Sequence, residues 1–69
     1  MKNDVIEVNP NKVSGTPVFA GTRVPIKNLF DYLEGGETLE DFLEGFPPVS
    51  REQAVAVLEM AGKSLIFAL

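Results

Sequence analysis

The hydrophobic residues follow two different periods along the chain. Residues 5–8 and 18–20 are short runs rich in β-branched and aromatic residues, and proline, asparagine, serine and glycine surround them. Such runs favour strands, and the residues between them favour turns. From Pro25 onward, apolar residues recur at i, i+3, i+4 and i+7, which is the spacing of one face of an α-helix. The pattern therefore predicts a short hairpin followed by helices.

The first two helices are predicted from their start and stop signals. Pro25 suits a first helical position, and the glycines at 35 and 36 suit a helix C-terminus. Thr38 is expected to cap the second helix, with Asp41 as the acid of a capping box. Pro47-Pro48 cannot continue a helix, so the second helix is expected to end there.

The third helix carries more apolar surface than one face can hold. Ser50 and Gln53 form a capping box at its start. One stripe contains Ala54, Val55, Leu58, Ala61, Gly62 and Leu65, and a second contains Val57, Met60, Ser64 and Phe67. The second stripe is expected to contact another chain, and the alternative is that it packs on the N-terminal strands. The candidate residues for a partner or dimer contact are Val57, Met60, Leu65, Ile66, Phe67 and Leu69.

These elements predict a single, mainly α domain. An extended or β segment over residues 1–24 precedes a three-helix unit over residues 25–69, which resembles a helix-turn-helix or homeodomain-like bundle. The chain has 69 residues and contains neither cysteine nor histidine. Small domains of this size often need disulfides, a metal or a partner chain for stability. Because cysteine is absent, disulfides and zinc-thiolate sites are excluded, and a homodimer is the expected source of stability.

Charge is unevenly distributed along the chain. The net charge is −4, and residues 31–44 contain six acids and no base. These acids are expected to form a solvated face rather than a magnesium site, because they lie on two short helices and do not converge. No nucleophile has an imidazole to activate it, and no phosphate-binding loop is present. We therefore expect no enzyme activity, no catalytic residue, no metal and no cofactor.

Several basic residues are candidates for DNA contact. In a helix-turn-helix the third helix enters the major groove, where Arg51 could pair with guanine and Gln53 with adenine. Arg23 and Lys27 could bind phosphate near the first helix, and Lys63 lies on the third. The alternatives are that Gln53 is only a cap partner, that Arg51 and Lys27 are solvated, and that Arg23 holds its own loop.

No targeting or membrane segment is evident. The first residues lack the apolar run of a secretion signal, and the longest apolar stretch covers only residues 65–69. A cytoplasmic location without membrane contact is the expected outcome.

One stretch of the chain resembles a known family. Residues 14–26 read Ser-Gly-Thr-Pro-Val-Phe-Ala-Gly-Thr-Arg-Val-Pro-Ile. This stretch, with the preceding strand, Asn9-Pro10 and the helices that follow, is similar to the signature of the domain-of-unknown-function 433 (DUF433) family. The resemblance covers about residues 5–65. The paired Pro47-Pro48 departs from many members, and so does an end soon after the third helix.

The resemblance carries functional expectations. Many members look like antitoxins encoded beside a toxin with a PIN-like ribonuclease fold. It therefore implies an antitoxin that dimerises, covers its cognate toxin and represses its own promoter by binding operator DNA. Toxin contact is expected either at residues 65–69 or on the acidic segment. Two alternatives stay open, namely a dimeric transcriptional regulator without a toxin and an assembly module that binds only protein.

Overall fold

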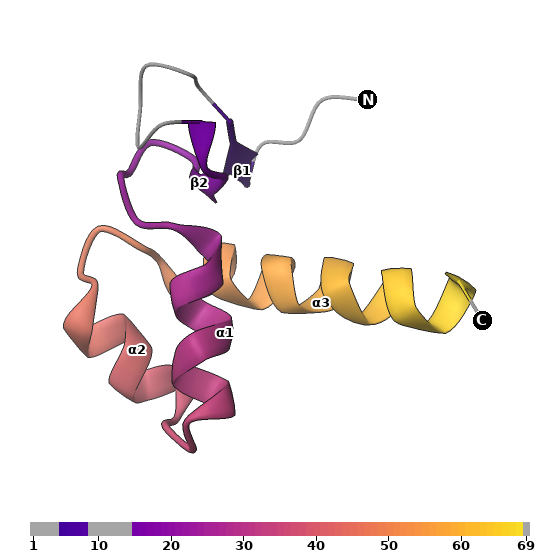
Figure 1. The fold of residues 1–69 in the computed structure, drawn as a ribbon. Coiled ribbons are helices and arrows are strands. Elements are labelled where there is room, and N and C mark those ends of the chain that lie inside the picture. The colour runs from indigo at the N-terminus through magenta and orange to yellow at the C-terminus, as the bar shows by residue number, and fades with distance from the viewer. Residues whose placement is uncertain (1–4, 9–14, 69) are drawn as a thin grey trace.

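A two-stranded hairpin and three helices make up the protein (Figure 1). The computed structural model describes residues 5–8 and 15–68, and it describes side chains as far as residue 64. The elements are β1 (Ile6–Glu7), β2 (Val18–Phe19), α1 (Ile26–Glu34), α2 (Leu39–Gly45) and α3 (Arg51–Ala68). The predicted class, a short β-hairpin followed by a mainly helical three-helix unit, is confirmed.

The hairpin presents its second strand to the core. β1 and β2 pair antiparallel, with Ile6 opposite Phe19 and Glu7 opposite Val18. Both residues of β2 are fully buried. Because a two-stranded hairpin is marginal on its own, this burial against the helices is what stabilises it.

The ends of α1 are fixed by proline and glycine. Pro25 lies one residue outside the helix as its N-cap, with φ −63° and ψ 139°, whereas the sequence predicted it as the first helical residue. The reason is tertiary, since Pro25 also forms an isolated antiparallel bridge with Val18 and so keeps an extended backbone. At the other end, Gly36 adopts a φ of 89°, a left-handed conformation that suits glycine after a helix.

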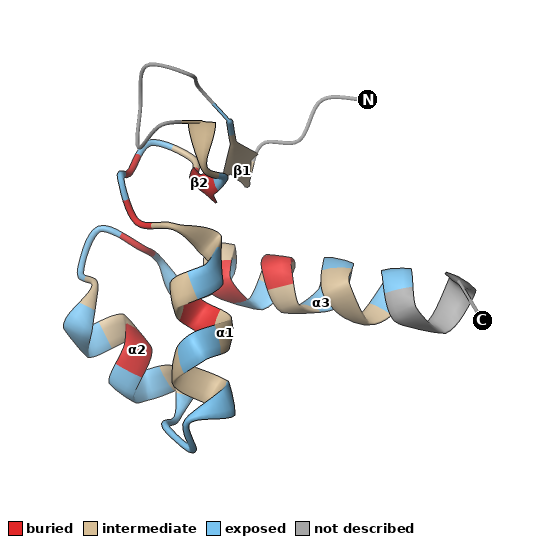
Figure 2. Ribbon diagram, in the orientation of Figure 1, coloured by how far each residue is buried: buried red, intermediate tan, exposed pale blue. Residues whose placement is uncertain are grey.

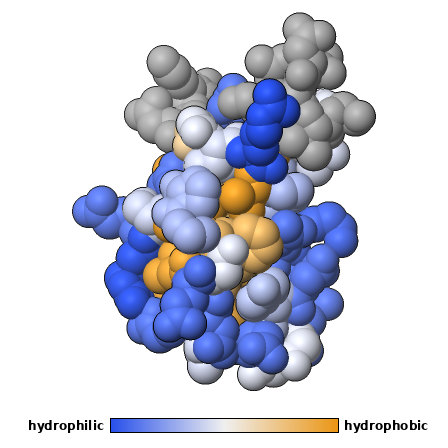
Figure 3. Space-filling view, turned by 90° about the vertical axis from the view of Figure 1, so that its left-hand side faces the viewer, coloured by the Kyte–Doolittle hydropathy of each residue, from blue (hydrophilic) through white to orange (hydrophobic). Residues whose placement is uncertain are grey.

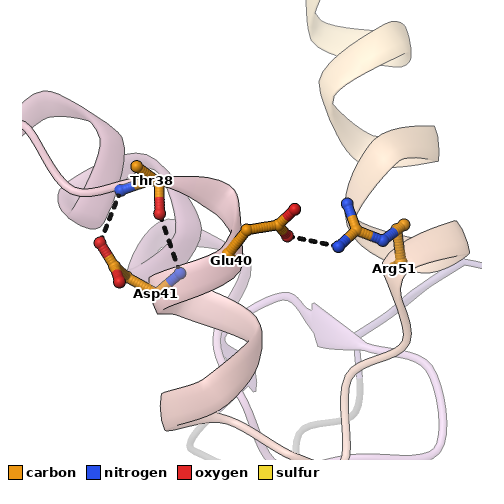
Figure 4. Close-up of polar contacts among 4 residues, drawn as sticks. All are labelled: Thr38, Glu40, Asp41 and Arg51. Carbon is orange, nitrogen blue, oxygen red and sulfur yellow. Dashed lines mark hydrogen bonds and ion pairs between the residues drawn. The ribbon is translucent and has the colours of Figure 1, made fainter.

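Both predicted capping boxes are present. The amide of Asp41 donates to Thr38 Oγ1, and the amide of Thr38 donates to Asp41 Oδ2, each at 3.1 Å (Figure 4). At the start of α3, the amide of Gln53 donates to Ser50 Oγ, and the amide of Ser50 donates to Gln53 Oε1, again at 3.1 Å. These bonds satisfy helix N-terminal amides that have no intrahelical partner.

The core lies where β2, α1, α2 and the start of α3 meet (Figure 2). Phe19, Leu29 and Phe42 are fully buried at its centre. Aromatic contacts extend it, with ring centroids of Phe42 and Phe46 5.0 Å apart and those of Tyr32 and Phe42 5.7 Å apart. Val49, Ala54 and Val57 close the cluster from the side of α3.

Only one face of the first half of α3 packs on this core. Ala54 and Val57 are buried and Leu58 packs against them, whereas Val55 is 38% exposed. The predicted division into stripes was therefore wrong at two positions: Val57, a predicted partner residue, belongs to the chain's own core, and Val55 belongs to the outside. Periodicity alone could not decide this, because both sets have helical spacing. Beyond Leu58 the helix extends away from the other elements (Figure 1).

Candidate functional site

The loop between β2 and α1 is held by a dense set of hydrogen bonds. Thr22 Oγ1 donates to the carbonyl of Phe19 at 2.8 Å and accepts from the amide of Val24 at 3.0 Å. The amide of Gly21 donates to Glu7 Oε1 at 3.1 Å. Gly21 has a φ of 76°, which glycine adopts without strain. The loop therefore has one well-defined conformation, and the glutamate in β1 that supports it was not anticipated, since 14 residues separate it from the glycine.

Arg23 lies in this loop with its side chain exposed. Among the described residues it has neither a hydrogen-bond nor an ion-pair partner, so the alternative in which it holds its loop finds no support here. Thr22 holds the loop instead, because its hydroxyl joins both sides of the turn. Lys27, the other basic candidate of this region, pairs with Asp31 on the surface of α1 at 2.8 Å.

Gln53 joins α3 to the loop after β2. Its Nε2 donates to the carbonyl of Ala20 at 2.9 Å, while its Oε1 accepts from the amide of Ser50. The side chain is therefore both a cap partner and a tertiary link between residues far apart in the sequence. Both the oxygen and the nitrogen of its amide are bonded to groups of this chain. The amide could contact a DNA base only if these two hydrogen bonds broke.

Arg51, the other candidate for base contact, pairs with Glu40 of α2 (Figure 4). This ion pair is exposed and joins the start of α2 to the start of α3. Lys63, further along α3, is exposed. The structure thus brings Arg51 and Gln53 to the first turn of one helix, as predicted, but engages both of them within the chain.

The six acids of residues 31–44 are all exposed. We call them the acidic surface: Asp31, Glu34, Glu37, Glu40, Asp41 and Glu44. Hydrogen bonds from the backbone amide and side chain of Thr38 hold the pKa of Asp41 below its usual value. Within the described residues, no three acids converge on a point where a metal ion could bind. The acidic surface is therefore a distributed charge.

A hydrophobic area lies on the side of the molecule where α2 is found (Figure 3). Figure 3 faces the side on which α2 lies and shows hydrophobic residues in the middle of that face, with hydrophilic residues around them. Leu39 and Leu43 of α2 are half-buried. A partly apolar centre within a polar rim is typical of protein interfaces.

The other predicted partner residues lie in the second half of α3. Met60 is 36% exposed. Leu65, Ile66 and Phe67 belong to the helix, but their side chains lie outside the described residues, and so does all of Leu69. None of the helices in the described ranges combines the length and apolar character that crossing a bilayer requires.

Comparisons with known proteins give relatives without an assigned activity. The chain is 32% identical over 50 residues to the uncharacterized protein y4eO of Sinorhizobium fredii, a match that covers 72% of this chain and 23% of that protein. Its fold is similar to the crystal structure of a DUF433 member from Anabaena variabilis, with a TM-score of 0.74 and 22% identity. That match covers 87% of this chain and 59% of the other. A family model described as a protein of unknown function (DUF433) matches residues 6–61, and the chain therefore belongs to the DUF433 family.

Proposed function

We propose that this protein is the antitoxin of a toxin–antitoxin pair, a non-catalytic homodimer that acts in the cytoplasm. Its partner in this proposal is a ribonuclease with a PIN-like fold, which it binds and neutralises. The observation that carries the proposal is the acidic surface, in which all six acids of residues 31–44 are exposed and the segment itself contains no base.

An acidic surface suits a protein that covers an RNA-binding cleft. A ribonuclease must attract phosphate, so its cleft carries an excess of positive charge. Complementary charge speeds association and selects the correct partner. Two of the acids, Asp31 and Glu40, pair with bases of this chain, but Glu34 and Glu44 are in no ion pair with another described residue. The hydrophobic area on the α2 side of the molecule would add a contact from which water is excluded, which charged groups alone do not provide (Figure 3).

Operator binding has weaker support and stays a prediction. Its two base-reading candidates, Arg51 and Gln53, already contact Glu40 and the carbonyl of Ala20. A net charge of −4 also opposes phosphate binding. Arg23 is the basic candidate that the loop holds in an exposed position.

Co-expression with the product of the adjacent reading frame tests the proposal. We expect that product to be a nuclease that arrests growth when expressed alone, and we expect this chain to restore growth and to form a complex with it. The Glu44→Lys variant should weaken the complex about tenfold and reduce its dependence on salt, because it reverses one charge of the acidic surface. Its fold should be retained, since a cation in the last turn of α2 is favoured by the helix dipole.

Glu52→Lys is the matched control. Glu52 is also an exposed acid, but it lies in the first turn of α3, outside the acidic surface. Both variants change the net charge by the same amount, so a difference between them reports position rather than total charge. Equal binding by the two variants would refute the role of the acidic surface. An adjacent gene product without toxicity would refute the antitoxin proposal itself.

A further inference from the structure

The second half of α3 extends beyond the core of the described chain. The contribution of the helix to the core ends at Leu58, and Glu59, Lys63 and Ser64 are all exposed. The helix nevertheless continues to Ala68, well clear of the other elements (Figure 1). The second half of α3 therefore presents a surface that the core of the described chain does not cover.

Gly62 marks a place where a second helix could approach the backbone of α3 closely. Glycine inside a helix costs roughly 0.5–1 kcal/mol relative to alanine. Nothing in the described chain explains the cost, because a Cβ placed on Gly62 would have no neighbour within 4 Å. At 3.6 residues per turn, Gly62 lies on the same side of α3 as the exposed Val55. A helix that packs on this side could approach the backbone closely at Gly62.

The charged residues beside Val55 and Gly62 on α3 can pair with the same residues of a second copy of the helix. Glu59 and Lys63 are the only charged residues after Glu52, and both are exposed. Neither forms an ion pair with another described residue. Consider a second copy of α3 that runs antiparallel, with the two-fold axis level with Ala61. Glu59 of each copy then lies level with Lys63 of the other on the same flank of the contact. In a parallel two-fold pair the two copies of this flank lie on opposite sides of the contact, so these ion pairs do not form.

From these observations we infer that the homodimer forms by antiparallel packing of two α3 helices, centred beside Ala61 and Gly62, with two reciprocal Glu59–Lys63 ion pairs. The inference rests on the homodimer of the proposed function and specifies its contact. It assigns α3 to the second copy and leaves the acidic surface of α1 and α2 free for the other partner. The two reciprocal ion pairs, which only the antiparallel arrangement forms, decide its direction.

Charge reversal tests the arrangement. The full chain should be a dimer by light scattering and sedimentation. Glu59→Lys should weaken the dimer about tenfold or more, because two lysines then face each other at both symmetry-related contacts, and Lys63→Glu should weaken it equally by pairing glutamates. The double variant Glu59→Lys/Lys63→Glu should restore dimerisation, since the exchanged charges again meet opposite signs. A parallel dimer would be neither weakened by the single variants nor restored by the double variant, and that result would overturn the inference.

Cysteine cross-linking tests the register independently, on a chain that contains no other cysteine. With the axis level with Ala61, two copies of position 62 are offset by only about 3 Å along the helices, but two copies of position 55 by about 18 Å. Gly62→Cys should therefore form a disulfide-linked dimer on oxidation, whereas Val55→Cys should not, because a disulfide needs Cα atoms within about 7 Å. Cross-linking at both positions would indicate a parallel pair and overturn the inference.

A packing variant separates assembly from folding. Gly62→Leu raises the helix propensity of α3, so the monomer should keep or gain helicity by circular dichroism. The larger side chain should nevertheless weaken the dimer about tenfold by blocking close approach. Unchanged dimerisation would overturn the role of Gly62. A wild-type chain that is monomeric at all concentrations would overturn the dimer and this inference together, while toxin neutralisation and its loss in Glu44→Lys would still test the acidic surface separately.

Discussion

Replacing Gln53 with alanine is expected to lower the stability of the protein more than the loss of an ordinary surface side chain. The substitution removes the cap acceptor for the amide of Ser50 and the donor for the carbonyl of Ala20. A lost cap partner costs about 0.5–1 kcal/mol and a lost net hydrogen bond about 0.5–1.5 kcal/mol, so the sum is about 1–2.5 kcal/mol. For a domain of this size that corresponds to a fall in Tm of about 4–20 °C.

Gln53→Glu divides the effect into its two parts. Glutamate keeps an oxygen that can accept from the amide of Ser50, and it is the usual residue at this position of a capping box. It cannot donate to the carbonyl of Ala20 at neutral pH. We therefore expect Gln53→Glu to keep the cap but to lose the tertiary bond, at a cost of about 0.5–1.5 kcal/mol plus the repulsion between its second carboxylate oxygen and the carbonyl oxygen of Ala20.

Denaturant unfolding followed by circular dichroism measures both variants. The protein concentration must be the same throughout, because a dimer gains stability with concentration. Free energies of unfolding within about 0.3 kcal/mol of the wild type for both variants would refute the reasoning, since this is below the cost of even one lost bond. In that case the Gln53 amide would be available for other partners, and its predicted role in DNA contact would gain support.

Three further predictions concern the core, the loop and the first of the two capping boxes. Phe42→Ala should cost about 3–5 kcal/mol and unfold much of the protein at 25 °C, because the ring is fully buried among other aromatic rings; retained near-native ellipticity would contradict this. Gly21→Ala should cost about 1–2 kcal/mol through its φ of 76° alone, since the added Cβ meets nothing within 4 Å, and the Tm of the variant measures it. The pKa of Asp41 is lowered by its bonds to Thr38, so its contribution to stability is present at pH values above the unfolded pKa and is lost as the pH falls through the folded pKa. Unfolding free energies measured between pH 3 and pH 7 should therefore fall less steeply on acidification in Asp41→Asn than in the wild type.

The starts of α2 and α3 and the ends of α1 and α2 could be read from local chemistry. Thr38 with Asp41 and Ser50 with Gln53 mark helix starts because each side chain bonds an amide only three residues away. Gly36 and the paired prolines mark ends because their backbone preferences are intrinsic. These signals act over a few residues, so they hold whatever the rest of the chain does.

Tertiary structure decided everything that depends on where one element meets another. Val57 and Val55 have equivalent helical spacing and the same side chain. Only the position of α3 against Phe42 and its neighbours placed Val57 in the core and left Val55 exposed. Pro25 became a cap instead of a first helical residue because β2 pairs with it.

The candidate site divides in the same way. The sequence by itself determined that six acids fall in one segment, that basic residues flank it and that α3 has surplus apolar positions. Only the fold decided that Arg51 is paired with Glu40, that Gln53 is bonded to Ala20 and that Arg23 is exposed. The physical reason is that composition and period describe one element at a time, whereas a side chain's availability depends on partners that the fold brings from distant parts of the chain.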